Sequence, residues 1–119
     1  MNIVMLTGHL SSEPTVRELA SGSVLVSYEL TTKVDDSSVS VPLVWFDPPK
    51  KVSVGAGDEI TAVGTVRRRF YRAGGVTQSR TEVVVVQLAR LADKRAAASQ
   101  RRWVESALGA TGEKGLRSS

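Results

Sequence analysis

The sequence predicts an all-β fold, a small antiparallel barrel or sandwich followed by a helical or flexible segment. Three observations support this prediction. Apolar and polar residues alternate along several short stretches, which is typical of strands with one buried face. Glycine, proline and aspartate separate these stretches, as they do at the turns of hairpins. Residues 1–91 contain no stretch with a helical pattern, so the turns connect strand to strand.

The composition fits one small domain in a reducing compartment. The chain has 119 residues, of which 41% are hydrophobic, enough for a modest core. It has no cysteine, which excludes disulfides and thiol chemistry and fits a cytoplasmic location. No apolar run approaches the ~20 residues that span a membrane, and the N-terminus lacks a signal-peptide pattern. We therefore expect a cytoplasmic protein with no membrane partner.

The first two strands are expected at residues 2–8 and 23–32. The first is an apolar run that ends at Gly8, and the second alternates with period two. The face of the second strand that is expected to be buried holds Val24, Val26, Tyr28 and Leu30. Between these strands, residues 9–22 contain Pro14 and a Ser-Gly turn, so we expect a loop rather than a helix.

A third strand is expected at residues 39–46, a fourth from Glu59 and a fifth over residues 80–91. Pro42 cannot donate to a ladder, so the third strand has an edge or a bulge there. Gly64 interrupts the fourth strand, and a lone glycine there marks a bulge or sharp bend of the kind that closes a small barrel. The inward-facing residues are expected to be Val39, Val41, Leu43 and Trp45 in the third strand and Ile60, Ala62 and Val66 in the fourth.

The most distinctive stretch is residues 64–88, a long hairpin that turns at Gly74 and Gly75. Its arms carry Arg67, Arg68, Arg69, Phe70, Tyr71, Arg72 and Arg80. Cations interleaved with rings suit a polyanion with exposed bases, because arginine binds phosphate and rings stack on bases. Since side chains alternate along a strand, Arg68 and Phe70 point away from Tyr71, and only one row can face a given ligand. The alternative is a solvated charged hairpin whose rings pack on its own base.

The charge of the chain is uneven. Residues 1–60 hold four Lys/Arg and eight Asp/Glu, a net charge of −4, whereas residues 61–119 hold twelve Lys/Arg and four Asp/Glu, a net charge of +8. Such an asymmetry raises the local concentration of an anionic partner and speeds its encounter. It does not distinguish nucleic acid from an acidic protein face or a membrane surface.

After Leu91 the composition changes to that of a helix. Residues 92–108 are rich in helix formers, Asp93 suits the first turn and Gly109 suits the end. Residues 111–119 have the composition of a disordered tail. The segment is open to two interpretations. It is either a docked or self-associating helix with Trp103 in an apolar contact, or a disordered basic tail that adds weak DNA affinity.

The sequence contains no catalytic constellation. His9 is the single histidine, and no Cys or carboxylate pair lies near it at metal-ligand spacing. The paired acids Asp35–Asp36 and Asp58–Glu59 lie in turns, where aspartate favours local backbone bonds. No glycine-rich segment has the strand–loop–helix context of a phosphate-binding loop. We therefore expect a binding protein, not an enzyme, with no metal and no cofactor.

Four segments, in the right order, resemble the bacterial single-stranded DNA-binding protein family. MNIVMLTGHL resembles the family's opening strand, and EPTVRELASG its Asp-Pro-Glu-x-Arg segment with the turn that follows. VGAGDEITAVGTVRRRFY resembles the Gly-Asp-x-Val-x-x-x-Gly-x-Leu-x-x-Arg-x-aromatic signature, and RTEVVV the Glu-Val strand after the long hairpin. The resemblance covers residues 1–91. It implies an OB fold, a five-stranded antiparallel Greek-key barrel, with residues 92–119 as an additional C-terminal segment.

The resemblance also implies a function. Members of the family bind single-stranded DNA without sequence specificity in DNA replication, recombination and repair, and they assemble as homotetramers; a dimer is the alternative here. Such a protein is cytoplasmic and joins the nucleoid when bound to DNA. Phe46 matches the stacking aromatic that ends the third strand, and Tyr71 or Phe70 matches the one on the hairpin. The expected DNA-binding residues are Arg17, Lys33, Phe46, Arg67, Arg69, Phe70, Tyr71, Arg72 and Arg80, with Lys50 and Lys51 as further cations on the path.

The sequence departs from the family pattern in ways that weaken stacking. The tryptophan expected at the head of the third strand falls on Ser40, and the aromatic of the preceding hairpin falls near Asp36. Residues 47–58 are too short and too rich in proline and glycine for the family's helix. The chain ends in EKGLRSS, so the protein partners of the family's acidic tail tip are not expected. We predict weaker, more electrostatic binding by a shortened paralogue.

Two other functions remain open from the sequence. The first is an interaction protein that kept the OB barrel and docks an acidic partner on its basic hairpin. The second is an RNA-binding OB module. Both fit the barrel and the basic hairpin, and the depleted stacking residues favour the first.

Overall fold

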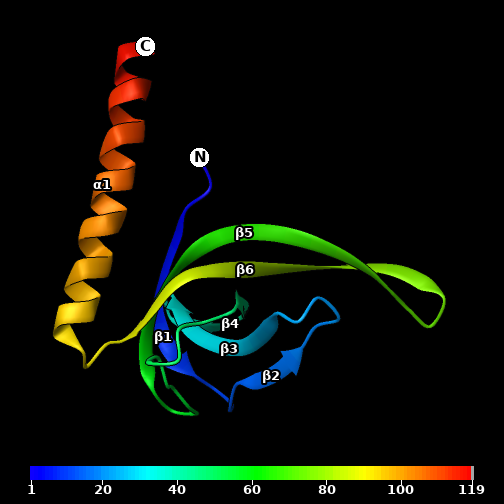
Figure 1. Ribbon diagram of the computed structural model, residues 1–119. Helices are drawn as coiled ribbons and strands as arrows, with labels where there is room; N and C mark the ends of the chain where they lie inside the picture. The colour runs from blue at the N-terminus through cyan, green and yellow to red at the C-terminus, as the bar shows by residue number, and fades with distance from the viewer. Residues whose placement is uncertain (119) are drawn as a thin grey trace.

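The computed structural model describes the backbone of residues 1–118 and the side chains of residues 1–109. It contains six strands and one helix (Figure 1). The strands are β1 (Val4–Leu10), β2 (Thr15–Glu18), β3 (Val24–Val34), β4 (Ser37–Phe46), β5 (Glu59–Ala73) and β6 (Val76–Arg90), and the helix is α1 (Lys94–Ser118). The described part of the chain holds no helix long and apolar enough to cross a membrane.

Five of the strands close a barrel with the connectivity of an OB-like fold, as predicted. The sheet order is β1-β5-β6-β4-β3, and β1 pairs β3 through His9 and Leu10 to close the ring. The β4–β6 pairing is parallel, at Leu43 and Val44, while β1–β5, β3–β4 and β5–β6 are antiparallel. This Greek-key order leaves β5 and β6 free to extend beyond the barrel as one long hairpin.

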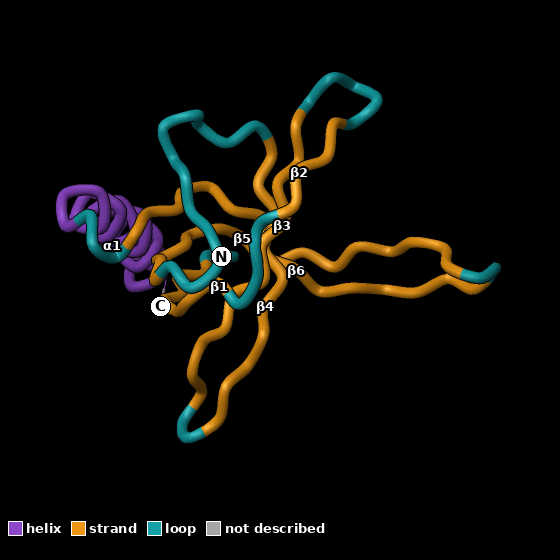
Figure 2. The backbone as a smooth tube through the Cα atoms, turned by 90° about the horizontal axis from the view of Figure 1, so that it is seen from below, coloured by secondary structure: helices purple, strands orange, loops and turns teal. Residues whose placement is uncertain are grey.

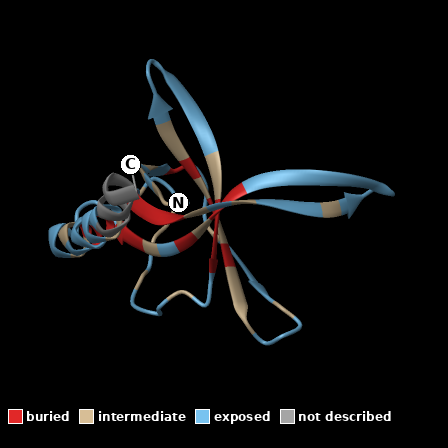
Figure 3. Ribbon diagram, turned by 90° about the horizontal axis from the view of Figure 1, so that it is seen from above, coloured by how far each residue is buried: buried red, intermediate tan, exposed pale blue. Residues whose placement is uncertain are grey.

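The core confirms the alternation predicted for residues 23–32, but only part of the inward rows predicted for the third and fourth strands. Val39 and Val66, which were expected to face inward, are 41% and 40% exposed because they lie where β4 and β5 leave the barrel, and Val44 is buried between Leu43 and Trp45. Tyr28 and Leu30 of β3 and Leu43 and Trp45 of β4 are buried, with at most 6% of each side chain exposed. Trp45 is therefore a core residue, and Phe46, the next residue, points outward. Burial also raises the pKa of the Tyr28 hydroxyl to about 12. In Figure 3 the buried residues gather where the strands cross, and the arms that leave the barrel are exposed.

Gly64 lies at the predicted irregularity. The β5–β6 register shifts between Val63 and Gly64, and a side chain at Gly64 would collide with the carbonyl oxygen of Val84. A side chain at Gly8 would likewise collide with the carbonyl oxygen of Thr31. Gly8 was expected to end the first strand, but it lies within it. That strand continues to Leu10, since glycine lets two backbones approach closely.

The loop expected at residues 9–22 is partly wrong, because it contains β2. Residues Thr15–Glu18 pair with Val24–Ser27 of β3 at the edge of the sheet. All four residues of β2 are exposed, so the strand is held by its ladder and shows no burial pattern in the sequence. Pro14 precedes the strand, where its missing donor costs no ladder bond.

The long hairpin is paired along its whole length (Figure 2). The two-residue turn Gly74–Gly75 has positive φ at both positions, which suits a tight hairpin turn. Because this turn fixes the register, Ala73 faces Val76 and the pairing continues down to the barrel. The return strand therefore begins at Val76, earlier than the expected residue 80.

Helix α1 begins with Asp93 as its N-cap, whose Oδ1 accepts a hydrogen bond from the Ala96 amide at 3.0 Å. Its Ala97, Gln100 and Val104 are buried against the barrel, so the helix is docked as one interpretation expected, but Trp103, which was expected in the apolar contact, is 41% exposed. The helix does not stop at Gly109 and continues to Ser118, through residues expected to be disordered. Adding a residue to a formed helix costs far less than nucleating one. Ser119, the last residue of that expected tail, lies outside the described residues.

Candidate nucleic-acid interface

One outer face of the sheet gathers most of the predicted binding residues. We call it the platform face; it consists of Glu29, Phe46, Arg67, Arg69, Tyr71, Gln78, Arg80 and Glu82. In β4 the core residue Trp45 directs Phe46 outward, and in β5 the pairing of Val66 with the core residue Val83 directs Arg67 outward. Strands β3, β4, β5 and β6 thus each contribute to a single surface that runs from the base of the hairpin toward its tip.

A buried carboxylate holds two arginines of the platform face. Arg67 Nη2 lies 2.7 Å from Glu82 Oε2, and Arg69 Nε lies 3.4 Å from Glu82 Oε1. The Glu82 side chain is 1% exposed, while the side chains of Arg67 and Arg69 are 39% and 45% exposed. Glu82 thus orients both guanidinium groups, and their outer edges remain open to an anion.

Each of these arginines also lies over a ring. The Arg67 guanidinium carbon is 5.4 Å from the centre of the Phe46 ring, and that of Arg69 is 5.2 Å from the centre of the Tyr71 ring. Both distances are within the range of cation–π attraction. The Tyr71 hydroxyl donates to Gln78 Oε1 at 3.4 Å across the hairpin. Each ring of the platform face therefore lies beside an arginine.

A second carboxylate pairs with the arginine on the return strand. Arg80 Nη2 lies 3.0 Å from Glu29 Oε1, and the Ser40 hydroxyl donates to Glu29 Oε2 at 3.1 Å. Ser40 occupies the position where the family resemblance predicts tryptophan. Here that position supports a carboxylate instead of offering a ring, which makes this part of the platform face polar.

Two predicted residues, Phe70 and Arg72, lie on the opposite side of the hairpin or at its tip. Phe70 is 66% exposed and pairs with Ser79 on the side away from Tyr71. Arg68 shares that side by alternation. Arg72 Nη2 donates to the carbonyl of Gly75 at 2.8 Å and so braces the turn. The structure therefore separates Phe70 and Arg72 from the other hairpin residues.

The two other predicted cations differ in their position. Arg17 is exposed on β2 and pairs with Leu25 of β3, which in turn pairs with Phe46, so Arg17 lies two strands from Phe46 on the same side of the sheet. Lys33, near the end of β3, lines a separate hollow of about 370 Å³ together with His9 and Glu59.

Sequence reasoning missed the two carboxylates, Glu29 and Glu82. A signal for Glu82 was present, because a two-residue turn at Gly74–Gly75 places residues 67 and 82 opposite each other by counting. No comparable count exists for Glu29, since its contact with Arg80 joins two strands that are far apart in the sequence. With three arginines and two carboxylates, the platform face has a net charge of only +1.

The described residues contain no group of three or more His, Cys, Asp or Glu side chains placed to hold a metal ion. Comparison with known proteins adds no identification: no family model matches the chain, and no curated protein matches it significantly.

Proposed function

We propose that this protein binds single-stranded DNA on the platform face, without sequence specificity. The observation that carries the proposal is the convergence of Phe46 and Tyr71 with Arg67, Arg69 and Arg80 on one outer surface of an OB-like barrel. Bases would stack on the two rings, and the guanidinium groups would neutralise the phosphates beside them. Every base has a π-face, so this chemistry does not select a sequence.

The ion pairs determine how strong such binding can be. A phosphate that approaches Arg67 or Arg69 shares the guanidinium with Glu82, and one that approaches Arg80 shares it with Glu29. The arginines remain partly exposed, so a phosphate can take a second edge of each group. We therefore propose weak, strongly salt-dependent binding, in keeping with a role in replication, recombination or repair beside a tighter-binding protein.

We also propose self-association, as a homotetramer or, failing that, a dimer. Residues Val4–Gly8 of β1 pair with β5, and the ladder to β3 begins only at His9. Thr7 and Gly8 already lie against Thr31 and Thr32 of β3, so the edge of β1 that is open to a second copy is Val4–Leu6. Light scattering after size-exclusion chromatography tests this proposal, and a monomeric mass at micromolar concentration would reject it.

The function is tested by titrating fluorescein-labelled oligo-dT with the protein at low salt and following anisotropy. Saturable binding at micromolar protein is expected. An OB-fold interaction protein would give no saturable change, and the DNA proposal would then fail. Unlabelled oligo-dT and matched oligo-rU are compared as competitors. Clear preference for the RNA would favour the RNA-binding alternative instead.

A further inference from the structure

A hollow of the described molecule lies away from the platform face, between α1, β6 and residues 49–54. It has a volume of about 790 Å³, and we call it the α1 groove. The residues that matter for its chemistry are Lys51, Val86, Arg95, Ala96, Ser99 and Gln100. We infer that a single-stranded nucleic acid bound to the platform face continues into the α1 groove, an inference that rests on the proposed function.

The groove and the platform face share one strand. Glu82 of β6 lies under the platform face, and Val86 and Gln87 of the same strand line the groove. Residues 49–54 also begin three positions after Phe46, so the chain that leaves the platform face leads to the groove wall. Val86 is 49% exposed at the bulge between the two sites, which gives a ligand an apolar surface to cross.

The groove carries cations that are free for phosphate. Lys51 and Arg95 line it, and neither forms an ion pair with any residue whose side chain is described. Arg90, a third basic residue of the lining, is held by Asp58 at 3.4 Å and by the carbonyl of Ser53 at 3.0 Å. Lys51 and Arg95 thus differ from the platform arginines, which are all paired with carboxylates.

A ring follows these cations along the helix. Trp103 is one turn beyond Ser99 and two turns beyond Ala96, both of which line the groove, so all three lie on one flank of α1. The Trp103 side chain is 41% exposed. The flank therefore carries an exposed ring about two turns beyond the groove cation Arg95, and a strand of stacked bases and phosphates requires both kinds of group along its path.

Gln100 anchors the helix wall of the groove to the barrel. Its Nε2 donates to the carbonyls of Thr61 at 3.2 Å and Gln87 at 3.1 Å, which fixes the orientation of the amide. Its Oε1 is buried and has no hydrogen-bond partner among the described residues. An acidic peptide would satisfy Lys51 and Arg95 but gives no reason for the exposed ring beside them.

The test uses tryptophan fluorescence. The other tryptophan, Trp45, also lines the groove but is only 6% exposed, so only Trp103 offers an exposed ring on which a base can stack. Oligo-dT of about 5 and about 15 nucleotides spans the range of site sizes of OB folds. The longer oligomer is expected to quench Trp103, and the quenching should disappear in Trp103→Phe. The short oligomer should bind the platform face and leave Trp103 unchanged.

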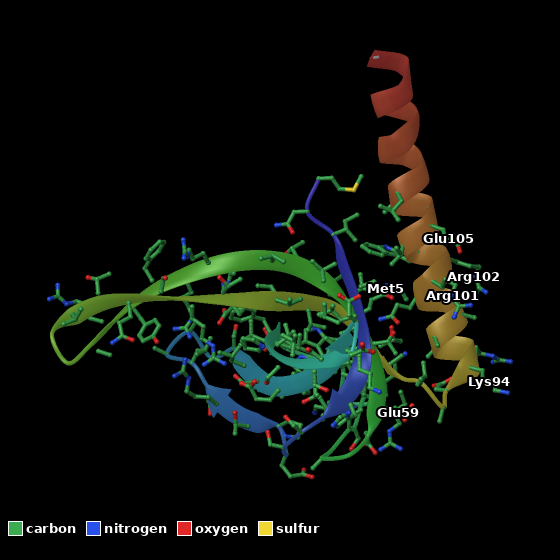
Figure 4. All side chains as sticks on the ribbon, turned by 180° about the vertical axis from the view of Figure 1, so that it is seen from behind. Met5, Glu59, Lys94, Arg101, Arg102 and Glu105 are labelled. Atoms are coloured by element: carbon green, nitrogen blue, oxygen red, sulfur yellow. The ribbon has the colours of Figure 1, made fainter. Side chains whose placement is uncertain are left out.

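A pair of charge variants provides the matched control. Lys51→Gln/Arg95→Gln removes two cations of the groove, and Lys94→Gln/Arg101→Gln removes two from another flank of α1, which does not line the groove. Figure 4 labels Lys94 and Arg101 on the helix, and Met5 of β1 and Glu59 of β5 on the neighbouring barrel. Only the groove variant should weaken binding of the longer oligomer. Its plot of log binding constant against log salt concentration should have a slope smaller in magnitude by about 0.7 for each phosphate that is no longer neutralised.

The outcomes separate the two proposals. If both oligomers bind but neither quenches Trp103, and the two double variants behave alike, the groove inference is overturned and the proposed function stands. If the short oligomer quenches Trp103 as strongly as the long one, the groove is not a continuation of the platform face and the inference is also overturned. If neither oligomer binds the wild-type protein, the proposed function fails and the inference fails with it.

Discussion

Glu82 pairs with Arg67 in the ladder and is almost completely buried, although it lies on the outer face of the sheet. A buried carboxylate is stable only when its oxygens are satisfied, and here the two oxygens take one guanidinium each. Glu29 has a similar role toward Arg80, but its side chain is 41% exposed. At the scale of single residues, the two carboxylates therefore differ in how much the fold depends on them.

Glu82→Gln should lower the free energy of unfolding by about 1–2 kcal/mol, because charged hydrogen bonds become neutral ones in a buried place. Glu29→Gln is the matched control, and its effect should stay within about 0.5 kcal/mol, since exposed pairs contribute little. Urea denaturation of both variants measures the difference. If the two variants lower the free energy of unfolding equally, burial does not increase the contribution of the Glu82 ion pairs to stability.

The raised pKa of Tyr28 predicts that the folded protein loses stability at alkaline pH. Its pKa is raised from the ordinary value of 10.0 to about 12 in the folded state, because burial disfavours the phenolate. Its contribution is fully present below pH 10 and is lost as the pH rises through 12, which amounts to about 2–3 kcal/mol. Denaturation between pH 9 and 12 should show a smaller decline for Tyr28→Phe than for wild type. Parallel declines would contradict the assignment.

At the scale of elements, the β5–β6 hairpin depends on the bend at its base. The register shift at Gly64 brings the strand against the carbonyl of Val84, and the two-residue turn at Gly74–Gly75 fixes the other end. The hairpin presents Arg67, Arg69 and Tyr71 on one side as a consequence of this geometry. A change at Gly64 therefore affects the barrel and the platform face together.

Gly64→Ala should destabilise the protein by about 1–3 kcal/mol, the usual cost of forcing extra volume into a packed site. Gly109→Ala is a suitable control because a Cβ there meets open space. In a helix that change should stabilise by about 0.5–1 kcal/mol. Thermal unfolding of both variants, followed by circular dichroism, tests the contrast. A Gly64→Ala variant as stable as wild type would contradict the close approach to Val84.

The sequence predicts some elements much better than others, and the reason is burial. The strand at residues 23–32 has one buried face, so its alternation is visible in the sequence, whereas the buried run Leu43–Trp45 in the next strand is continuous. Thr15–Glu18 is exposed throughout and is held only by backbone pairing, which leaves no pattern. The sequence also underestimates the length of α1, because the glycines from Gly109 onward argue for an end that the helix does not have.

At the scale of the whole molecule, the order of the strands was predictable and the contacts between distant strands were not. The resemblance implies the OB fold, and the closed barrel is consistent with it. Which hairpin row lies against Phe46 depends on the register at the barrel, so the sequence could not choose between Tyr71 and Phe70. The docking of α1 was equally hidden, since it uses Gln100, a polar residue, against two strand carbonyls.

The central claim is that the platform face, and not the charge of the hairpin in general, binds single-stranded DNA. The opposite side of the hairpin supplies matched controls of equal charge and similar shape. Arg67→Ala/Arg69→Ala is compared with Arg68→Ala/Arg72→Ala, and Tyr71→Ala with Phe70→Ala. The four variants and the wild type are titrated with oligo-dT at several salt concentrations.

The platform arginine variant should bind more weakly with a smaller salt slope, by about 0.7 for each phosphate that the removed guanidinium groups neutralise in the wild type. Tyr71→Ala should lose about 1–3 kcal/mol of binding free energy with little change in slope, because stacking releases no counterions. Arg68→Ala/Arg72→Ala and Phe70→Ala should stay close to wild type. If the variants on the two sides lose the same affinity and the same slope, the hairpin acts only through its overall charge and the platform face is not the binding site.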